Sequence, residues 1–245
     1  MPKTISTSNP HLQEAVKRLE RTQKTTGWVL IGYGVLAQWV ALTTTPLHPV
    51  AGLPFIAAGF FTLLWGDPAL LALAAVLFAF ACVPSLNPAL SLPGPDPIVQ
   101  MTGLDGWELA IVVGVKAVLA FNAIQNFLLF RMLYGTLSAS SADPTLDIIP
   151  PMVPNRTDRL ARWARSTGLV TVVIAGLGIA FVLVEPQALT TRVAAEMAGG
   201  LGLMAAGLGL GAAFSPTDER PAALLGLGAG LAGYMAAAFT LFWLS

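Results

Sequence analysis

The chain has 245 residues, of which 55% are hydrophobic and 11% are charged. Soluble domains carry about a quarter charged residues, so the composition excludes an ordinary soluble domain and predicts an all-α integral membrane protein. Thirteen basic residues balance thirteen acidic ones, which argues against a nucleic-acid partner. Cys82 is the only cysteine and excludes an intramolecular disulfide.

Residues 1–26 form a polar tail followed by an amphipathic segment. Leu12, Val16 and Leu19 recur at helical spacing within residues 11–25, against a mostly basic set of side chains. Such a segment is typical of a helix that lies on the membrane surface. It is too polar for a signal peptide, so we expect the apolar run that follows to remain as a membrane anchor.

Seven apolar segments follow, and we interpret each as a transmembrane helix. They cover residues 27–43, 50–65, 69–83, 107–134, 168–184, 193–214 and 222–244. A membrane span needs about 20 residues, with a range of about 17 to 25. The second and third segments are short, so they could be two spans or one re-entrant hairpin.

The basic residues decide between these alternatives. With seven spans, eleven basic residues fall on one side: Lys3, Lys17, Arg18, Arg21, Lys24, Arg131, Arg156, Arg159, Arg162, Arg165 and Arg220. Only Arg192 falls on the other side, and Lys116 lies within a span. This bias places the N-terminus in the cytoplasm and the C-terminus opposite it. We expect an energy-transducing or plasma membrane, with the bacterial inner membrane as the first choice.

An internal repeat organises these spans. Residues 18–27 have a near copy at residues 159–168, at a constant offset of 141, and residues 67–73 resemble residues 220–227. We predict two parallel three-helix repeats, 27–83 and 168–245, around a central linker helix at 107–134. Residues 84–106 form an outer Pro/Gly-rich loop, and residues 135–167 an inner loop with a basic helix. This 3+1+3 layout is similar to that of the SWEET sugar transporters, in layout alone, and no function is taken from it.

The fourth span carries the unusual polar side chains. Lys116 lies in an otherwise uncharged run from residue 109 to residue 130. At about 100° per residue, Glu108, Asn122 and Asn126 fall on one stripe. Gln125 lies at the far edge of this stripe, and Lys116 is roughly 80–120° away. This distribution predicts that the polar half of the helix faces protein or a water-filled cavity.

Two interpretations of Lys116 are open. A charge near the centre of a span costs about 2.5–3.5 kcal/mol on insertion scales, which is typical of a substrate or proton path. Alternatively, Lys116 extends towards the outer headgroups or Glu108, since side chains lean towards the helix N-terminus. The amides would then bond neighbouring helices.

The last two spans are rich in glycine. Gly207 and Gly211, and likewise Gly226 and Gly230, have the four-residue spacing that allows helices to approach closely. We expect tight packing of a helical hairpin. The alternative is a grooved surface for a lipid, a pigment or a partner helix.

The sequence offers few residues for chemistry. His48, in the first outer loop, is the one candidate ligand for a pigment or a metal, and no span contains a histidine. There is no HExxH or GxSxG motif and no pair of acidic residues within a span. We therefore predict no catalytic residue, no metal and no cofactor, although bound lipids are expected and a pigment is possible.

These features favour a structural or accessory subunit of a multi-subunit membrane complex, of the respiratory or photosynthetic kind. Its partners would be membrane lipids and other membrane-protein subunits. The alternative is a small-solute or ion transporter that uses the repeat interface and Lys116. A third possibility is a pigment- or lipid-binding membrane protein.

Overall fold

The computed structural model describes residues 10–44, 52–67, 69–86, 106–140, 154–185, 189–215 and 217–244, and over these ranges the chain is all-helical, without a strand. The seven helices are α1 (Pro10–Thr44), α2 (Leu53–Trp65), α3 (Leu70–Leu86), α5 (Gly106–Ser140), α6 (Pro154–Val184), α7 (Leu189–Ala213) and α8 (Arg220–Leu244). Four of them, α5 to α8, are long and apolar enough to cross a membrane, which fits a membrane location.

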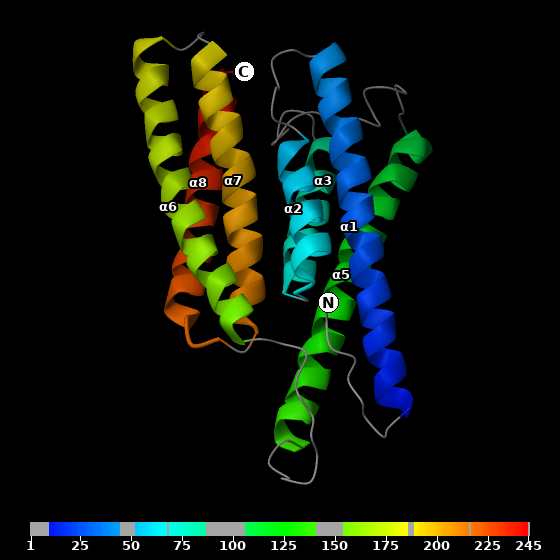
Figure 1. The fold of residues 1–245 in the computed structure, drawn as a ribbon. Coiled ribbons are helices and arrows are strands. Elements are labelled where there is room, and N and C mark those ends of the chain that lie inside the picture. The colour runs from blue at the N-terminus through cyan, green and yellow to red at the C-terminus, as the bar shows by residue number, and fades with distance from the viewer. Residues whose placement is uncertain are drawn as a thin grey trace.

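α1 is a single helix of 35 residues, about 52 Å long at 1.5 Å per residue. It runs from Pro10 through the basic residues into the apolar ones without a break (Figure 1). The amphipathic segment and the first apolar segment are therefore parts of one helix and not two separate elements. The backbone stays helical between the two parts, so the basic turns extend along the same axis as the apolar turns. The basic residues of the predicted inner loop are likewise the first turns of α6.

α2 and α3 are short and are joined by a tight turn. They have 13 and 17 residues, fewer than the about 20 of a full span. Gly66 ends α2 in the left-handed conformation, with φ of 59°, which glycine adopts without a steric penalty. The Ala69 amide then donates a 2.9 Å hydrogen bond to Asp67 Oδ1, which fixes the turn into α3.

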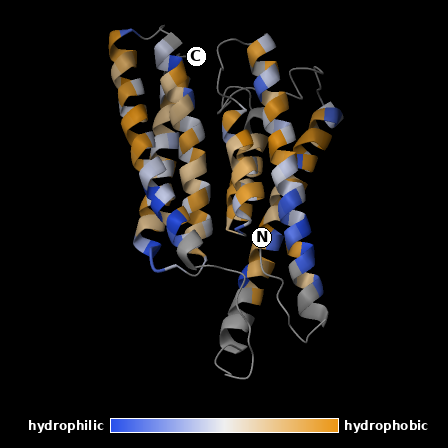
Figure 2. Ribbon diagram, viewed as in Figure 1, coloured by the Kyte–Doolittle hydropathy of each residue, from blue (hydrophilic) through white to orange (hydrophobic). Residues whose placement is uncertain are grey.

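Successive helices run in alternating directions, so the start of α1 and the end of α8 lie at opposite ends of the molecule (Figure 1). Hydrophilic residues gather along the lower part of α1 and at the lower ends of α6 and α8 (Figure 2). Arg220 begins α8, and Arg159, Arg162 and Arg165 lie in the first turns of α6. One end of the molecule is therefore the basic end.

The packing is uneven. α6, α7 and α8 each pack against the other two, and α1 packs mainly against α2. α3 connects these groups because it contacts both α5 and α7, and every residue from Leu70 to Ala75 is buried. α7 is the most enclosed of the four candidate spans, with 72% of its apolar window buried, whereas the value for α5 is 17%. The helix predicted as a linker over 107–134 extends over Gly106–Ser140 and stands beside α3 and α1 (Figure 1).

Candidate functional site

Lys116 lies on the packed face of α5. Its side chain is only 3% exposed, and Ala120, Ala123 and Phe127 on the same face are also buried. At about 100° per residue these positions follow Lys116 along one stripe, so the stripe that carries the lysine is the one that contacts α3. The small side chains of the two alanines let α3 approach closely.

The ammonium group of Lys116 contacts two further helices. Nζ donates a 3.1 Å hydrogen bond to the carbonyl oxygen of Ala81 in α3. The same nitrogen lies 5.4 Å from the ring centroid of Tyr33 in α1, within the range of a cation–π interaction. The Tyr33 ring is held by an edge contact with Phe55 at a centroid distance of 4.8 Å. Lys116 therefore joins α1, α3 and α5.

Both contacts present partial negative charge to the ammonium group. Ala81 lies near the C-terminal end of α3, where helix carbonyls carry partial negative charge. Pro84 in the same region has no N–H, so it leaves the Phe80 carbonyl without its usual helical donor. A carbonyl-rich helix end and the negative face of a ring can thus hold a cation. The side chain is buried between helices.

The remaining polar residues of α5 do not gather around Lys116. Asn126 is 5% exposed, and its Nδ2 donates to the backbone oxygen of Asn122 at 2.7 Å and to its Oδ1 at 3.0 Å. Asn122 and Gln125 are exposed, and Glu108 is half-buried. Asn126 follows Lys116 by ten residues, about 15 Å along the axis. Within this chain, the expectation that the polar half of the helix faces protein or a water-filled cavity is not tested for Asn122 and Gln125, which no described helix covers.

Glu196 is a buried carboxyl group to which the sequence drew little attention. It belongs to α7 and is fully buried, at 0% exposure. In the sequence, Glu108 and Glu196 are the acidic residues that fall within predicted spans, 107–134 and 193–214. Its burial follows from the central place of α7 between α3, α6 and α8, which the sequence did not reveal.

Polar residues at the basic end connect the start of α6 to two turns between other helices. The Thr157 hydroxyl, in the first turn of α6, donates to Asp67 Oδ2 in the α2–α3 turn at 3.4 Å. Both residues are buried. Beside them, Asp158 Oδ1 accepts a hydrogen bond from the Thr217 hydroxyl and one of 3.2 Å from the Asp218 amide. The start of α6 is therefore tied both to the α2–α3 turn and to the α7–α8 turn.

The four glycines singled out in the sequence lie in different helix contacts. A Cβ on Gly207 would lie 2.8 Å from the Cα of Leu73 in α3, and one on Gly211 would meet the Ala69 carbonyl. A Cβ on Gly230 would lie 2.6 Å from the carbonyl oxygen of Gly202, which belongs to α7. Gly226 meets Ala164 of α6 instead. The expected hairpin of the last two spans thus accounts for Gly230, while the other three approach α3 or α6.

In the described part of the chain, no group of three or more His, Cys, Asp or Glu side chains could hold a metal ion. His48, the candidate ligand, lies outside the described residues.

No protein-family model matches the chain, and no solved structure matches it significantly. Among curated proteins, UvrABC system protein C of Acidothermus cellulolyticus is similar to part of it, with 34% identity over 91 residues. The matched region is 36% of this chain and 13% of that protein. A similarity that covers so little of either chain does not establish a common family, and no activity is transferred from it.

Proposed function

We propose that this protein is a non-catalytic structural subunit of a multi-subunit membrane complex, and that it binds its partner through the outward face of α5. The observation that carries the proposal is the one-sided burial of this helix. α5 packs against α3 and touches α1, and its opposite face is covered by none of the described helices.

The outward face of α5 is a continuous stripe. Its exposed members are Trp107, Gly114, Val118, Phe121, Gln125 and Met132. At about 100° per residue they lie within roughly 60° of one another. The stripe is apolar except for the amide of Gln125, and a partner helix could follow it over most of its length.

Two members of the stripe suit a helix better than lipid. A Cβ on Gly114 would meet nothing within 4 Å, so this position leaves room for close approach by another backbone. Lipid chains offer no hydrogen-bond partner to the Gln125 amide, whereas a helix that carries Ser, Thr, Asn or Gln does. The proposed partner is therefore a transmembrane helix of another subunit with a polar side chain level with Gln125.

We further propose that all seven helices cross the membrane, in the 3+1+3 arrangement, with the basic end in the cytoplasm. The alternating helix directions and the gathering of basic residues at one end support this topology. α2 and α3, with 13 and 17 residues, are the shortest of the helices in this arrangement.

The test is purification in a mild detergent, with the mass of the complex and the identity and stoichiometry of its chains as the readout. We expect the unmodified protein to elute with other membrane proteins at fixed stoichiometry. Gly114→Leu and Gln125→Leu should each release the partner, because they fill the approach site and remove the amide.

Gly176→Leu in α6 is the matched control, because a Cβ there also meets nothing within 4 Å. It adds the same side chain to a different outward face and should keep the partner. Elution of the unmodified protein as a stable monomer would refute the proposal. Retention of the partner by both α5 variants would also refute it.

A second candidate function is small-solute or ion transport, which the burial of a cation at Lys116 favours. Flux through reconstituted vesicles that disappears in Lys116→Met, with the fold retained, would support transport over the subunit proposal. A visible absorption band in the purified sample would instead favour pigment binding.

A further inference from the structure

One face of α1 changes character along its length. From residue 17 onward, at about 100° per residue, eight exposed positions lie within roughly 80° of one another, on the side opposite the buried Leu19 and Leu30. The face is basic in its first part and apolar in its second. Its members are Lys17, Arg21, Lys24, Trp28, Gly32, Val35, Trp39 and Leu42.

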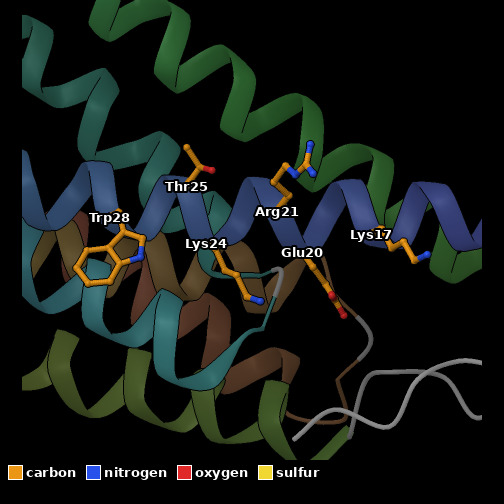
Figure 3. Close-up of a pocket in the computed structure, with 6 residues that line it drawn as sticks. All are labelled: Lys17, Glu20, Arg21, Lys24, Thr25 and Trp28. Atoms are coloured by element: carbon orange, nitrogen blue, oxygen red, sulfur yellow. The ribbon is translucent and has the colours of Figure 1, made fainter.

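The basic part surrounds a shallow hollow of about 410 Å³, lined by Lys17, Glu20, Arg21, Lys24, Thr25 and Trp28. Figure 3 shows Lys24 and Glu20 on one side of α1, Arg21 pointing towards α5, and the Trp28 ring one turn beyond Lys24. Three cations against one carboxylate leave a net charge of 3 − 1 = +2 in the hollow. The hollow therefore suits an anion.

The apolar part starts at Trp28, which is 66% exposed. Tryptophan prefers the membrane–water interface, so the cations one to three turns before it are level with the headgroups. Gly32 follows on the same face, and a Cβ there would meet nothing within 4 Å. Val35 and Trp39 continue the exposed apolar surface beyond this indentation.

We propose that this face of α1 binds an anionic phospholipid, with the phosphate in the hollow at Lys17 and Lys24 and with Arg21 adding positive charge nearby. One acyl chain lies in the indentation at Gly32, between Trp28 and Val35. The order of the face, cationic and then apolar along one line, matches the order of the phosphate and the acyl chains in a lipid. A free phosphate ion would use only the first part of this face.

α6 provides a comparison within the same molecule. At the offset of 141, Arg162 and Arg165 replace Arg21 and Lys24 and are also exposed. Asp158 takes the place of Lys17, and Val173 the place of Gly32. α6 thus has two of the cations without the third and without the indentation. We expect it to attract anionic lipid weakly and to hold no particular molecule.

Native mass spectrometry of the delipidated full chain tests the proposal. The added lipids are a short-chain phosphatidylglycerol and, as the neutral control, the phosphatidylcholine with the same chains. The double variant Lys17→Gln/Lys24→Gln should weaken phosphatidylglycerol binding about 25-fold, at about fivefold for each charge near the headgroups. Glu20→Gln should strengthen it about fivefold, and Gly32→Phe should weaken it without any change of charge.

The matched control is Arg162→Gln/Arg165→Gln, which removes the same number of charges from α6 and should change the affinity less than twofold. Equal loss from the α1 and α6 double variants would overturn the proposal, because attraction would then depend on total charge alone. Equal binding of the two lipids would overturn it too. Competition by inorganic phosphate as strong as that by phosphatidylglycerol would identify a free anion as the ligand and reject the lipid.

Discussion

α1 and α6 bury the same positions in different surroundings. Six positions on the packed face of α1 recur 141 residues later on α6 as buried positions: Leu19 and Leu160, Gln23 and Ala164, Gly27 and Gly168, Leu30 and Thr171, Gly34 and Ala175, and Ala37 and Gly178. α1 packs mainly against one helix, α2, whereas α6 packs against both α7 and α8.

The position of the buried stripe depends on the sequence of each helix, whereas the number of helices packed against it depends on its neighbours. The buried stripe follows from the spacing of small and apolar residues along each helix, so it is shared. The number of partners depends on the helices that follow, because α8 stays beside α6 while α3 turns towards α5 and α7. A repeated segment can thus keep its packed face and still enter a different arrangement.

The largest effect is expected at Lys116, where Tyr33 of α1 presents its ring to the cation. The position equivalent to Tyr33 is Ile174 in α6. Lys116→Glu should lower the free energy of unfolding by about 3–5 kcal/mol, since it buries an uncompensated anion against the Ala81 carbonyl and the ring face. Reversible unfolding in detergent micelles, followed by tryptophan fluorescence, measures the change.

Lys116→Met is the control for that variant, because it keeps the length of the side chain and removes the charge. Its cost should stay below about 1.5 kcal/mol. If the methionine variant proves as unstable as the glutamate variant, the ammonium itself is required for folding and the explanation by charge sign is incorrect.

The next largest loss of stability is expected at Gly168, and it should exceed the loss at the equivalent position, Gly27. A Cβ on Gly168 would lie 2.9 Å from the carbonyl oxygen of Gly226, whereas one on Gly27 would lie 2.8 Å from a side-chain carbon of Leu63. Backbone cannot move as a leucine side chain can, so Gly168→Val should cost about 1–3 kcal/mol and Gly27→Val less. Thermal unfolding of the two variants gives the order, and a larger loss in Gly27→Val would contradict it.

A smaller effect is expected from Thr157→Val, which gives α6 the residue that α1 has at the equivalent position, Val16. The variant removes the hydrogen bond to Asp67 and keeps the side-chain volume, so unfolding should become easier by about 0.5–1.5 kcal/mol. Thr217→Val, which removes the hydrogen bond from Thr217 to Asp158 of α6, serves as the comparison. Protease cleavage between α5 and α6 should accelerate in the first variant more than in the second.

The smallest effect, a gain in stability, is expected where a glycine faces open space. Gly176→Ala should stabilise α6 by up to about 1 kcal/mol, through helix propensity alone. Gly230→Ala has the same propensity gain, but its Cβ would press on the Gly202 carbonyl, so stability should fall. A gain in both variants would show that the α7–α8 contact is looser than its geometry indicates.

The helices were the part of the fold most accessible from the sequence. The apolar runs 50–65 and 69–83 predicted where α2 and α3 meet, and the structure has a turn between them, at Gly66. The continuity of α1 was not predicted, because a change from basic to apolar side chains does not reveal whether the backbone bends between them. The 3+1+3 arrangement of seven spans stays a prediction.

The helix that covers a given face was harder to predict than the face itself. Helical periodicity places Gly207 and Gly211 on one stripe of α7, but it does not say that α3 meets this stripe. For the same reason the burial of Lys116 and Glu196 could not be derived, since each depends on which helix covers it. Asn122 and Gln125 were expected to face protein or a water-filled cavity, and within this chain they are exposed because α5 has few neighbours.

The double-sided packing of α3 has a consequence for biosynthesis. α7 begins more than 100 residues after α3 ends. At a synthesis rate of about 5–20 residues per second, α3 therefore exists for roughly 5–20 s before its second neighbour emerges from the ribosome. During this interval the Gly207 and Gly211 contact surface of α3 is bare, and the nascent chain depends on lipid or on the insertion machinery to cover it.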